Sequence, residues 1–90
     1  MDLTELRERI DAIDAQMVEL FEQRMDICRQ VAQYKIASGK NVLDKSREAE
    51  KLARVRALAS NEFNGFCIVE LFEQIISMSR KLQYQLLMEN

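Results

Sequence analysis

The 90-residue sequence contains no histidine, no proline and no tryptophan, and it has only two glycines and two cysteines. Without histidine the chain cannot form a His-based catalytic triad, and a transition-metal site would lack its most common protein ligand. No carboxylate cluster has the spacing of metal ligands either, so we expect no metal ion. The absence of proline, together with abundant Ala, Leu, Glu, Lys, Gln and Arg, favours long uninterrupted helices.

Concentrated charge is also absent. The formal net charge is −2, and neither end carries a block of like charge, so we predict that neither nucleic acid nor a membrane surface is the main partner. No apolar run is long enough to cross a bilayer. Cys28 and Cys67 fall within helical patterns, and no signal peptide is recognisable. We therefore expect free thiols that pack as small apolar groups in a reducing, cytoplasmic environment.

The first forty residues predict one long amphipathic helix over residues 4–38. Asp2 and Thr4 are start signals, and Ser38-Gly39 is a stop signal. A charge in a helical seam is costly unless something pairs with it, so the single charge in this seam, Arg24, predicts a polar pocket. Every other member of the heptad seam is apolar or aromatic: Leu3, Leu6, Ile10, Ile13, Met17, Leu20, Ile27, Val31 and Tyr34.

The length of this helix bears on assembly. We assign residues 1–90 to one domain, and a compact domain of this size has a radius of gyration of about 12 Å. The first helix would be about 50 Å long, and the rest of the chain is too short to cover it. We therefore predict an all-α fold with a long N-terminal helix, a short second helix and a medium third helix, in an intertwined homodimer.

Two further helices are predicted after the first. Asp44 is well placed to cap a helix over residues 45–59, whose inward stripe reads Glu48, Leu52, Val55 and Ala59. Residues 60–65 form the next break, with Asn64-Gly65 as a turn signal. The third helix is expected over residues 66–87, with its seam at Ile68, Phe72, Ile75, Ser79, Leu82 and Leu86.

Polar side chains interrupt the apolar stripe of each predicted helix: Arg24 in the first, Glu48 in the second, and Ser79 with Gln83 in the third. One shared polar cavity would explain all of these interruptions. The alternative is a buried structural ion pair between Arg24 and Glu48 that fixes the register of the helices. The pattern alone leaves both interpretations open.

Each polar residue also has a plain structural explanation. A helix-capping role alone would explain Asp44. The Ser79 hydroxyl can bond back to a carbonyl one turn earlier, and Gln83 can be a tolerated surface amide. A role as a solvated surface charge would explain each of three further cations when it is considered alone: Arg7, Lys35 and Arg47.

Several short motifs, taken in order, resemble the all-helical chorismate mutase family, in which two three-helix chains intertwine and each active site uses both. The resemblance covers essentially the whole chain, and the order and spacing of its markers make it specific. These markers are LRERIDAID (6–14), Arg24, Lys35, VLDKSRE (42–48) and LFEQII (71–76), which leads into Ser79 and Gln83.

The resemblance implies how the substrate, chorismate, is recognised. Arg7 would reach from one protomer into the site of the other and, with Arg24 and Lys35, bind the two carboxylates. Ser79 would support the ring carboxylate, with Arg47 nearby. Arginine suits this task because its planar guanidinium can give a carboxylate two hydrogen bonds and stays charged when desolvated.

The same resemblance implies the reaction, a Claisen rearrangement of chorismate to prephenate in phenylalanine and tyrosine biosynthesis. Glu48, with the start of the second helix around Asp44, would hold the ring hydroxyl. Lys35 and Gln83 would donate hydrogen bonds to the ether oxygen whose bond breaks. The step is unimolecular and needs no nucleophile, general base, metal or other cofactor, which agrees with a sequence without histidine.

Two alternatives compete with this interpretation. An isochorismate-pyruvate lyase would use the same scaffold without the acidic pair, so the presence of Asp44 and Glu48 favours the mutase. A non-catalytic helical dimerisation module would use Arg24 and Glu48 for register only. The sequence also leaves open a fusion to prephenate dehydratase or prephenate dehydrogenase.

Overall fold

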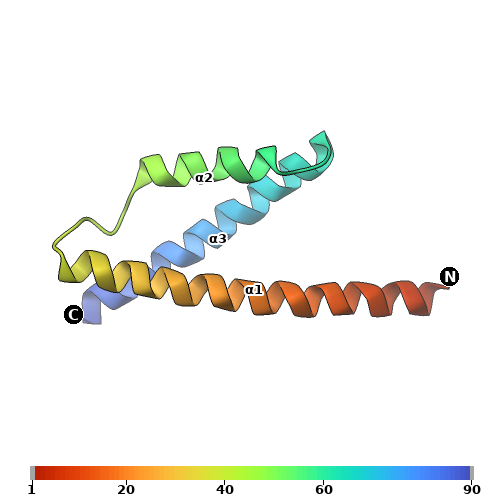
Figure 1. Ribbon diagram of the computed structural model, residues 1–90, viewed down its shortest axis with the longest axis horizontal. Helices are drawn as coiled ribbons and strands as arrows, with labels where there is room; N and C mark the ends of the chain where they lie inside the picture. Colours follow the sequence, from red (N-terminus) through yellow and green to blue (C-terminus); the bar gives the residue numbers. More distant parts are fainter. Residues whose placement is uncertain (1, 90) are drawn as a thin grey trace.

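The computed structural model describes residues 2–89, which form three α-helices and no strand (Figure 1). The helices are α1 (Leu3–Ala37), α2 (Lys45–Ala57) and α3 (Glu62–Glu89). The all-α class and the order of one long, one short and one medium helix are therefore confirmed. None of the helices in residues 2–89 is both long enough and apolar enough to span a membrane.

The first two helices begin at the predicted caps. The side chain of Asp2 accepts a 2.8 Å hydrogen bond from the backbone N–H of Glu5, and that of Asp44 accepts one of 3.0 Å from Arg47 N–H. Each carboxylate thereby satisfies a first-turn N–H that has no partner inside its helix. α1 ends before Gly39, whose φ of +71° lies in the left-handed region that favours glycine.

The start of α3 differs from the prediction. Asn64 and Gly65 do not form a turn but lie in the first turns of the helix, which begins at Glu62 rather than near residue 66. The reason is that the side chain of Asn61 accepts a 2.8 Å hydrogen bond from the backbone N–H of Asn64 and so caps the helix. Gly65 is buried, and a Cβ built on it would lie 3.5 Å from the Cγ of Arg56, so α3 packs closely on the end of α2.

α3 is the central element of the chain. It runs from the turn after α2 to the far end of α1 and packs against both helices, whereas no Cα atom of α1 lies within 8 Å of one in α2 (Figure 1). The buried apolar side chains in residues 2–89 are few and of small or medium size: Ala32, Val42, Val55 and Ile76. A single chain thus has only a small core for its length.

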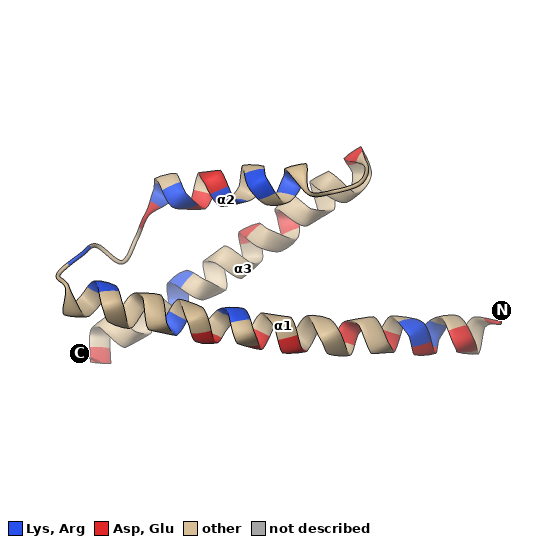
Figure 2. Ribbon diagram, in the orientation of Figure 1, with Lys and Arg blue, Asp and Glu red and all other residues tan. Residues whose placement is uncertain are grey.

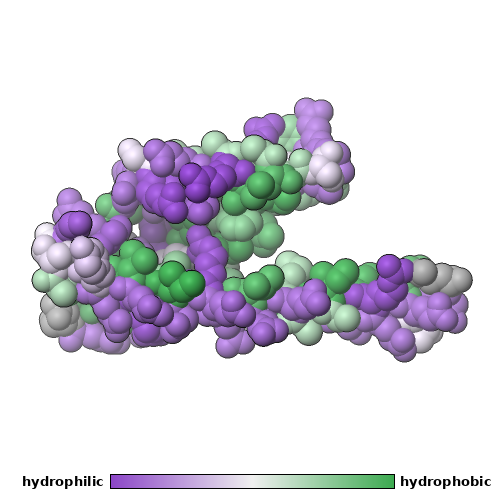
Figure 3. Space-filling view, in the orientation of Figure 1, coloured by the Kyte–Doolittle hydropathy of each residue, from purple (hydrophilic) through white to green (hydrophobic). Residues whose placement is uncertain are grey.

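The N-terminal half of α1 forms an arm that no other part of the described chain covers. Residues 3–20 are all exposed, and the arm projects beyond the other helices (Figure 1). The radius of gyration is 16.3 Å, well above the value of about 12 Å for a compact domain. Figure 3 shows apolar side chains along the upper edge of the arm in this view, and Ile10 and Ile13 are 55% and 56% exposed.

α1 carries two adjacent apolar stripes, and the chain covers only one of them. The stripe that packs within the chain is buried or half-buried and consists of Phe21, Met25, Cys28, Ala32 and Ile36. The predicted heptad seam lies beside it, and all of its apolar members remain exposed, by 40–64%. Arg24 is the one seam residue that is half-buried, because it lies on the side of the seam next to α3.

Candidate active site

The site begins with Arg24, where α1 meets α3. Nη1 of Arg24 donates a 2.9 Å hydrogen bond to the hydroxyl of Ser79, which is 7% exposed. The single hydroxyl proton of Ser79 is in turn donated to the carbonyl of Ile75 at 3.0 Å. The predicted hydrogen bond from Ser79 to a carbonyl one turn earlier in the helix therefore exists. It orients the hydroxyl so that its lone pairs face Arg24.

Neutral groups complete the surroundings of Arg24. The Sγ atom of Cys28 lies 3.7 Å from Nη1 of Arg24 and 3.6 Å from Oγ of Ser79. The ring of Phe72 lies beneath the guanidinium, with its centroid 5.9 Å from the Cζ atom, a distance at which a cation is attracted to an aromatic face. Within residues 2–89 Arg24 has no carboxylate partner, so its full positive charge is available to a ligand.

The alternative ion pair between Arg24 and Glu48 does not form. Oε1 of Glu48 instead lies 2.7 Å from Nη1 of Arg80 on α3. The physical reason is that α1 and α2 do not approach each other, whereas α3 packs against α2. Glu48 is thus held at the α2–α3 contact, as its place in the inward stripe of α2 predicted.

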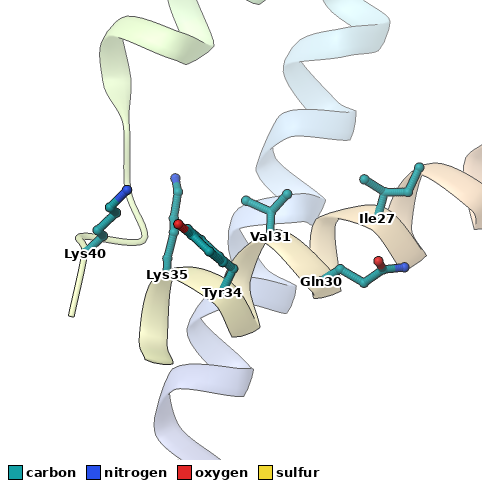
Figure 4. A pocket seen from close by; sticks show the side chains of 6 residues that line it. All are labelled: Ile27, Gln30, Val31, Tyr34, Lys35 and Lys40. Atoms are coloured by element: carbon teal, nitrogen blue, oxygen red, sulfur yellow. The ribbon is translucent and has the colours of Figure 1, made fainter. Parts of the chain in front are cut away.

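Lys35 lies near the other end of the site, close to the loop that follows α1. Its Nζ donates a 3.2 Å hydrogen bond to the carbonyl of Val42. In Figure 4 its side chain and that of Val31 point toward the side from which α2 begins. Lys35 also lines an open hollow of about 330 Å³, together with Ile27, Gln30, Val31, Tyr34 and Lys40, and half of these lining residues belong to the uncovered seam.

The start of α2 adds positive charge. Figure 2 shows Lys and Arg positions on all three helices in the half of the molecule that contains the start of α2 and the C-terminal half of α1. Lys51, one turn after Arg47, is half-buried. Its pKa is lowered from 10.5, first by burial and then by the charge of Arg47. The charges of Arg54 and Arg24 act in the same direction, and Cys28 acts in the opposite one. Repulsion between neighbouring cations thus adds to the effect of burial, and an anion would relieve this repulsion.

The remaining predicted residues differ in placement. Asp44 caps α2, which confirms its structural role. Gln83 is half-buried on α3, one turn beyond Ser79, and its amide has no hydrogen-bond partner within residues 2–89. Arg7 is exposed on the arm, about 25 Å along α1 from Arg24, so it cannot reach the Arg24 group of its own chain.

Three residues of this region were not among the predicted site residues. Cys28 was expected only as a core thiol, whereas it lies against both Arg24 and Ser79. Arg80 directly follows Ser79, and Lys51 follows Glu48 by three positions, which puts it on the same face of α2. The sequence did contain a signal for both cations: each lies close in sequence to a polar residue that interrupts an apolar stripe.

Comparison with known proteins shows the family of the chain. Residues 6–84 match the family described as chorismate mutase type II. The chain belongs to this family. It is 31% identical over 88 residues to a chorismate mutase of Methanocaldococcus jannaschii, covering 97% of this chain and 89% of that protein.

A second type of relative within the chorismate mutase family is longer. The chain is 32% identical over 89 residues to the bifunctional chorismate mutase/prephenate dehydratase of Escherichia coli K12, covering 98% of this chain and 23% of that protein. A bifunctional protein of the same name in Shigella flexneri matches equally. The chain thus spans about a quarter of the length of these bifunctional relatives. Membership of the chorismate mutase family confirms the resemblance predicted from the sequence motifs.

Proposed function

We propose that this chain catalyses the Claisen rearrangement of chorismate to prephenate, as an isomerase of aromatic amino-acid biosynthesis. The observation that carries the proposal is the state of Arg24, a half-buried guanidinium bonded only to neutral groups and positioned by a buried serine. Chorismate has two carboxylates, and Arg47 and Lys51 add further positive charge without an ion-pair partner in residues 2–89. A small dianion therefore fits the site.

The catalytic roles follow from the family resemblance. Arg24 and Lys35, with Arg7 of a partner protomer, hold the two carboxylates, and Ser79 and Arg47 support them. This clamp fixes the enolpyruvyl side chain over the ring in the reactive geometry. Because the reaction is unimolecular, holding this geometry replaces the work that a nucleophile or a general base performs in other enzymes.

The ether oxygen gains negative charge as its bond to carbon lengthens. Lys35 and Gln83 are the proposed donors to this oxygen, and each such donor commonly contributes about 3 kcal/mol to lowering the barrier. An ammonium group has three N–H donors, so Lys35 can keep its bond to the Val42 carbonyl while donating to substrate. Glu48 and the first turn of α2 at Asp44 hold the ring hydroxyl.

We further propose that the protein is a homodimer with shared active sites and acts in the cytoplasm. The support for the dimer is the uncovered arm and the second apolar stripe of α1, which no other part of residues 2–89 covers and a second copy of the chain can bury. Arg7 is exposed and far from Arg24 in its own chain, so it serves the site of its partner. The free cysteines, Cys28 and Cys67, suit a reducing compartment.

The decisive experiment follows the ultraviolet absorbance of chorismate with and without the protein. Faster loss of chorismate with formation of prephenate is expected. Decay at the rate seen in buffer would contradict the proposal and favour a dimerisation module. Formation of salicylate and pyruvate from isochorismate, with chorismate unchanged, would identify a lyase instead.

Shared sites have a separate test. Arg7→Ala and Lys35→Ala should each be nearly inactive alone. After mixing and exchange of protomers, a heterodimer contains one site with both Arg7 and Lys35, so about a quarter of wild-type activity should return. No recovery in a mixture that contains heterodimers would contradict shared sites.

A further inference from the structure

Two consecutive residues of α3 hold side chains from two helices, α1 and α2, that have no Cα atoms within 8 Å of each other. Ser79 accepts a 2.9 Å hydrogen bond from Arg24 of α1. Arg80 makes a 2.7 Å ion pair with Glu48 of α2. The first of these contacts belongs to the proposed carboxylate clamp, whereas nothing in the proposed function accounts for the second.

The ion pair engages only one oxygen of the Glu48 carboxylate. Nη1 of Arg80 bonds Oε1, and Oε2 has no hydrogen-bond partner within residues 2–89. The carboxylate is the less accessible partner, since the side chain of Glu48 is 22% exposed and that of Arg80 is 39% exposed. Arg80 therefore restrains the carboxylate through one oxygen and leaves the second oxygen free to accept.

Glu48 needs such a restraint because α2 itself offers none. A glutamate side chain has several rotatable bonds and loses conformational entropy when it is fixed. The neighbouring cations of α2, Arg47 and Lys51, make no ion pair with it. A charge-assisted bond to a planar guanidinium fixes the position of the carboxylate.

We propose that Arg80 is a positioning residue for substrate binding: by bonding Oε1 of Glu48 it orients Oε2 to accept the hydrogen bond of the substrate's ring hydroxyl. The inference rests on the proposed chorismate mutase function. The hydroxyl is present in both substrate and transition state and does not react, so the contact stabilises both about equally. Losing it should therefore change KM more than kcat.

The test compares steady-state kinetics of the wild-type protein with three variants, using chorismate as substrate. Arg80→Met should raise KM about tenfold, as expected for losing one hydrogen bond to a charged group, with kcat changed less than about twofold. Arg80→Lys, which keeps the charge, should recover part of the loss. Lys81→Met removes an adjacent exposed cation and should match the wild-type protein.

A double-mutant cycle separates positioning from a general effect of charge. In a Glu48→Gln background Arg80→Met should raise KM by less than about twofold, since the residue that it positions is already impaired. Equal effects of Arg80→Met in both backgrounds, or an unchanged KM in the single variant, would overturn the inference while leaving the mutase function intact. A wild-type protein that does not consume chorismate would overturn both.

A structural effect is distinguished by thermal unfolding of each variant. If Arg80→Met does not fold, Arg80→Lys and Arg80→Gln replace it in the same cycle. A KM that rises in Arg80→Gln and is partly rescued in Arg80→Lys, at equal Tm, supports positioning. A KM that changes only in parallel with Tm would show that Arg80 merely holds α2 on α3.

Discussion

Replacing Ile13 with alanine tests whether the uncovered arm is an interface between two copies of the chain. Ile13 is 56% exposed, and full burial of an isoleucine side chain stabilises by about 1.5–3 kcal/mol. Because Ile13 is exposed in the single chain, somewhat more than half of this stabilisation remains to be gained when a dimer forms. Truncation to alanine should remove about 1 kcal/mol of the stabilisation gained per protomer. A two-fold dimer contains the residue twice, so the loss is about 2 kcal/mol, or a dissociation constant about 30-fold higher.

The assay is sedimentation equilibrium over a dilution series. Alanine is a better helix former than isoleucine, so the variant does not weaken α1 itself, and a loss of association must come from lost contacts. Glu19→Ala, which truncates an exposed side chain on the polar face of the same helix, is the matched control. A dissociation constant for Ile13→Ala within about threefold of the control would refute the idea that this stripe is buried between protomers.

Three further predictions concern the site and the helices. Lys51→Met should raise the free energy of unfolding at pH 7 by roughly 0.5 kcal/mol or less, because the depressed pKa of Lys51 makes its charged form unfavourable in the folded state. The stability of the wild-type protein should rise with pH through the window below 10.5, as Lys51 loses its proton. Urea titrations should therefore show that the advantage of Lys51→Met over the wild-type protein disappears above that window. An equal advantage in Lys81→Met would contradict an origin in the surroundings of Lys51. Gly65→Ala should raise Tm by a few degrees, since the added Cβ makes only ordinary contacts and glycine costs about 0.5–1 kcal/mol inside a helix; a lower Tm would mean that α3 must move away from α2. Gln83→Glu should lose about a hundredfold in kcat/KM at pH 7 and regain activity as pH falls toward the carboxyl pKa of about 4.3, and an unchanged pH profile would exclude Gln83 from the ether contact.

Much of the fold follows from local signals that the sequence displays. Asp2 and Asp44 were predicted as caps, and both accept the expected first-turn hydrogen bonds. The inward stripe of α2 is buried or half-buried throughout. The start of α3 was predicted wrongly because Asn-Gly is a turn signal only when no cap precedes it, and here Asn61 caps a helix that continues through both residues.

The candidate site was predicted in part. Polar interruptions of apolar stripes correctly indicated that Arg24 and Ser79 meet, because both positions face the helix contact that the stripe forms. The partner of Glu48 was missed, since helical periodicity tells which face a residue occupies but not which of two neighbouring helices supplies the opposite charge. Sequence spacing likewise could not show that one stripe of α1 is covered within the chain and the adjacent one is not.

Arg24 and Glu48 contact consecutive residues of α3, Ser79 and Arg80, so the site depends on the angular phase of that helix. Neighbouring positions in an α-helix point about 100° apart, so Ser79 can contact α1 while Arg80 contacts α2. Inserting or deleting one residue of α3 before Ser79 would turn residues 79 and 80 by the same angle relative to the start of the helix, which packs on α2, and the two contacts could not both survive. A change of seven residues, close to two full turns, would preserve the phase. The number of residues between the start of α3 and Ser79 is therefore constrained by helical phase, independently of which residues fill these positions.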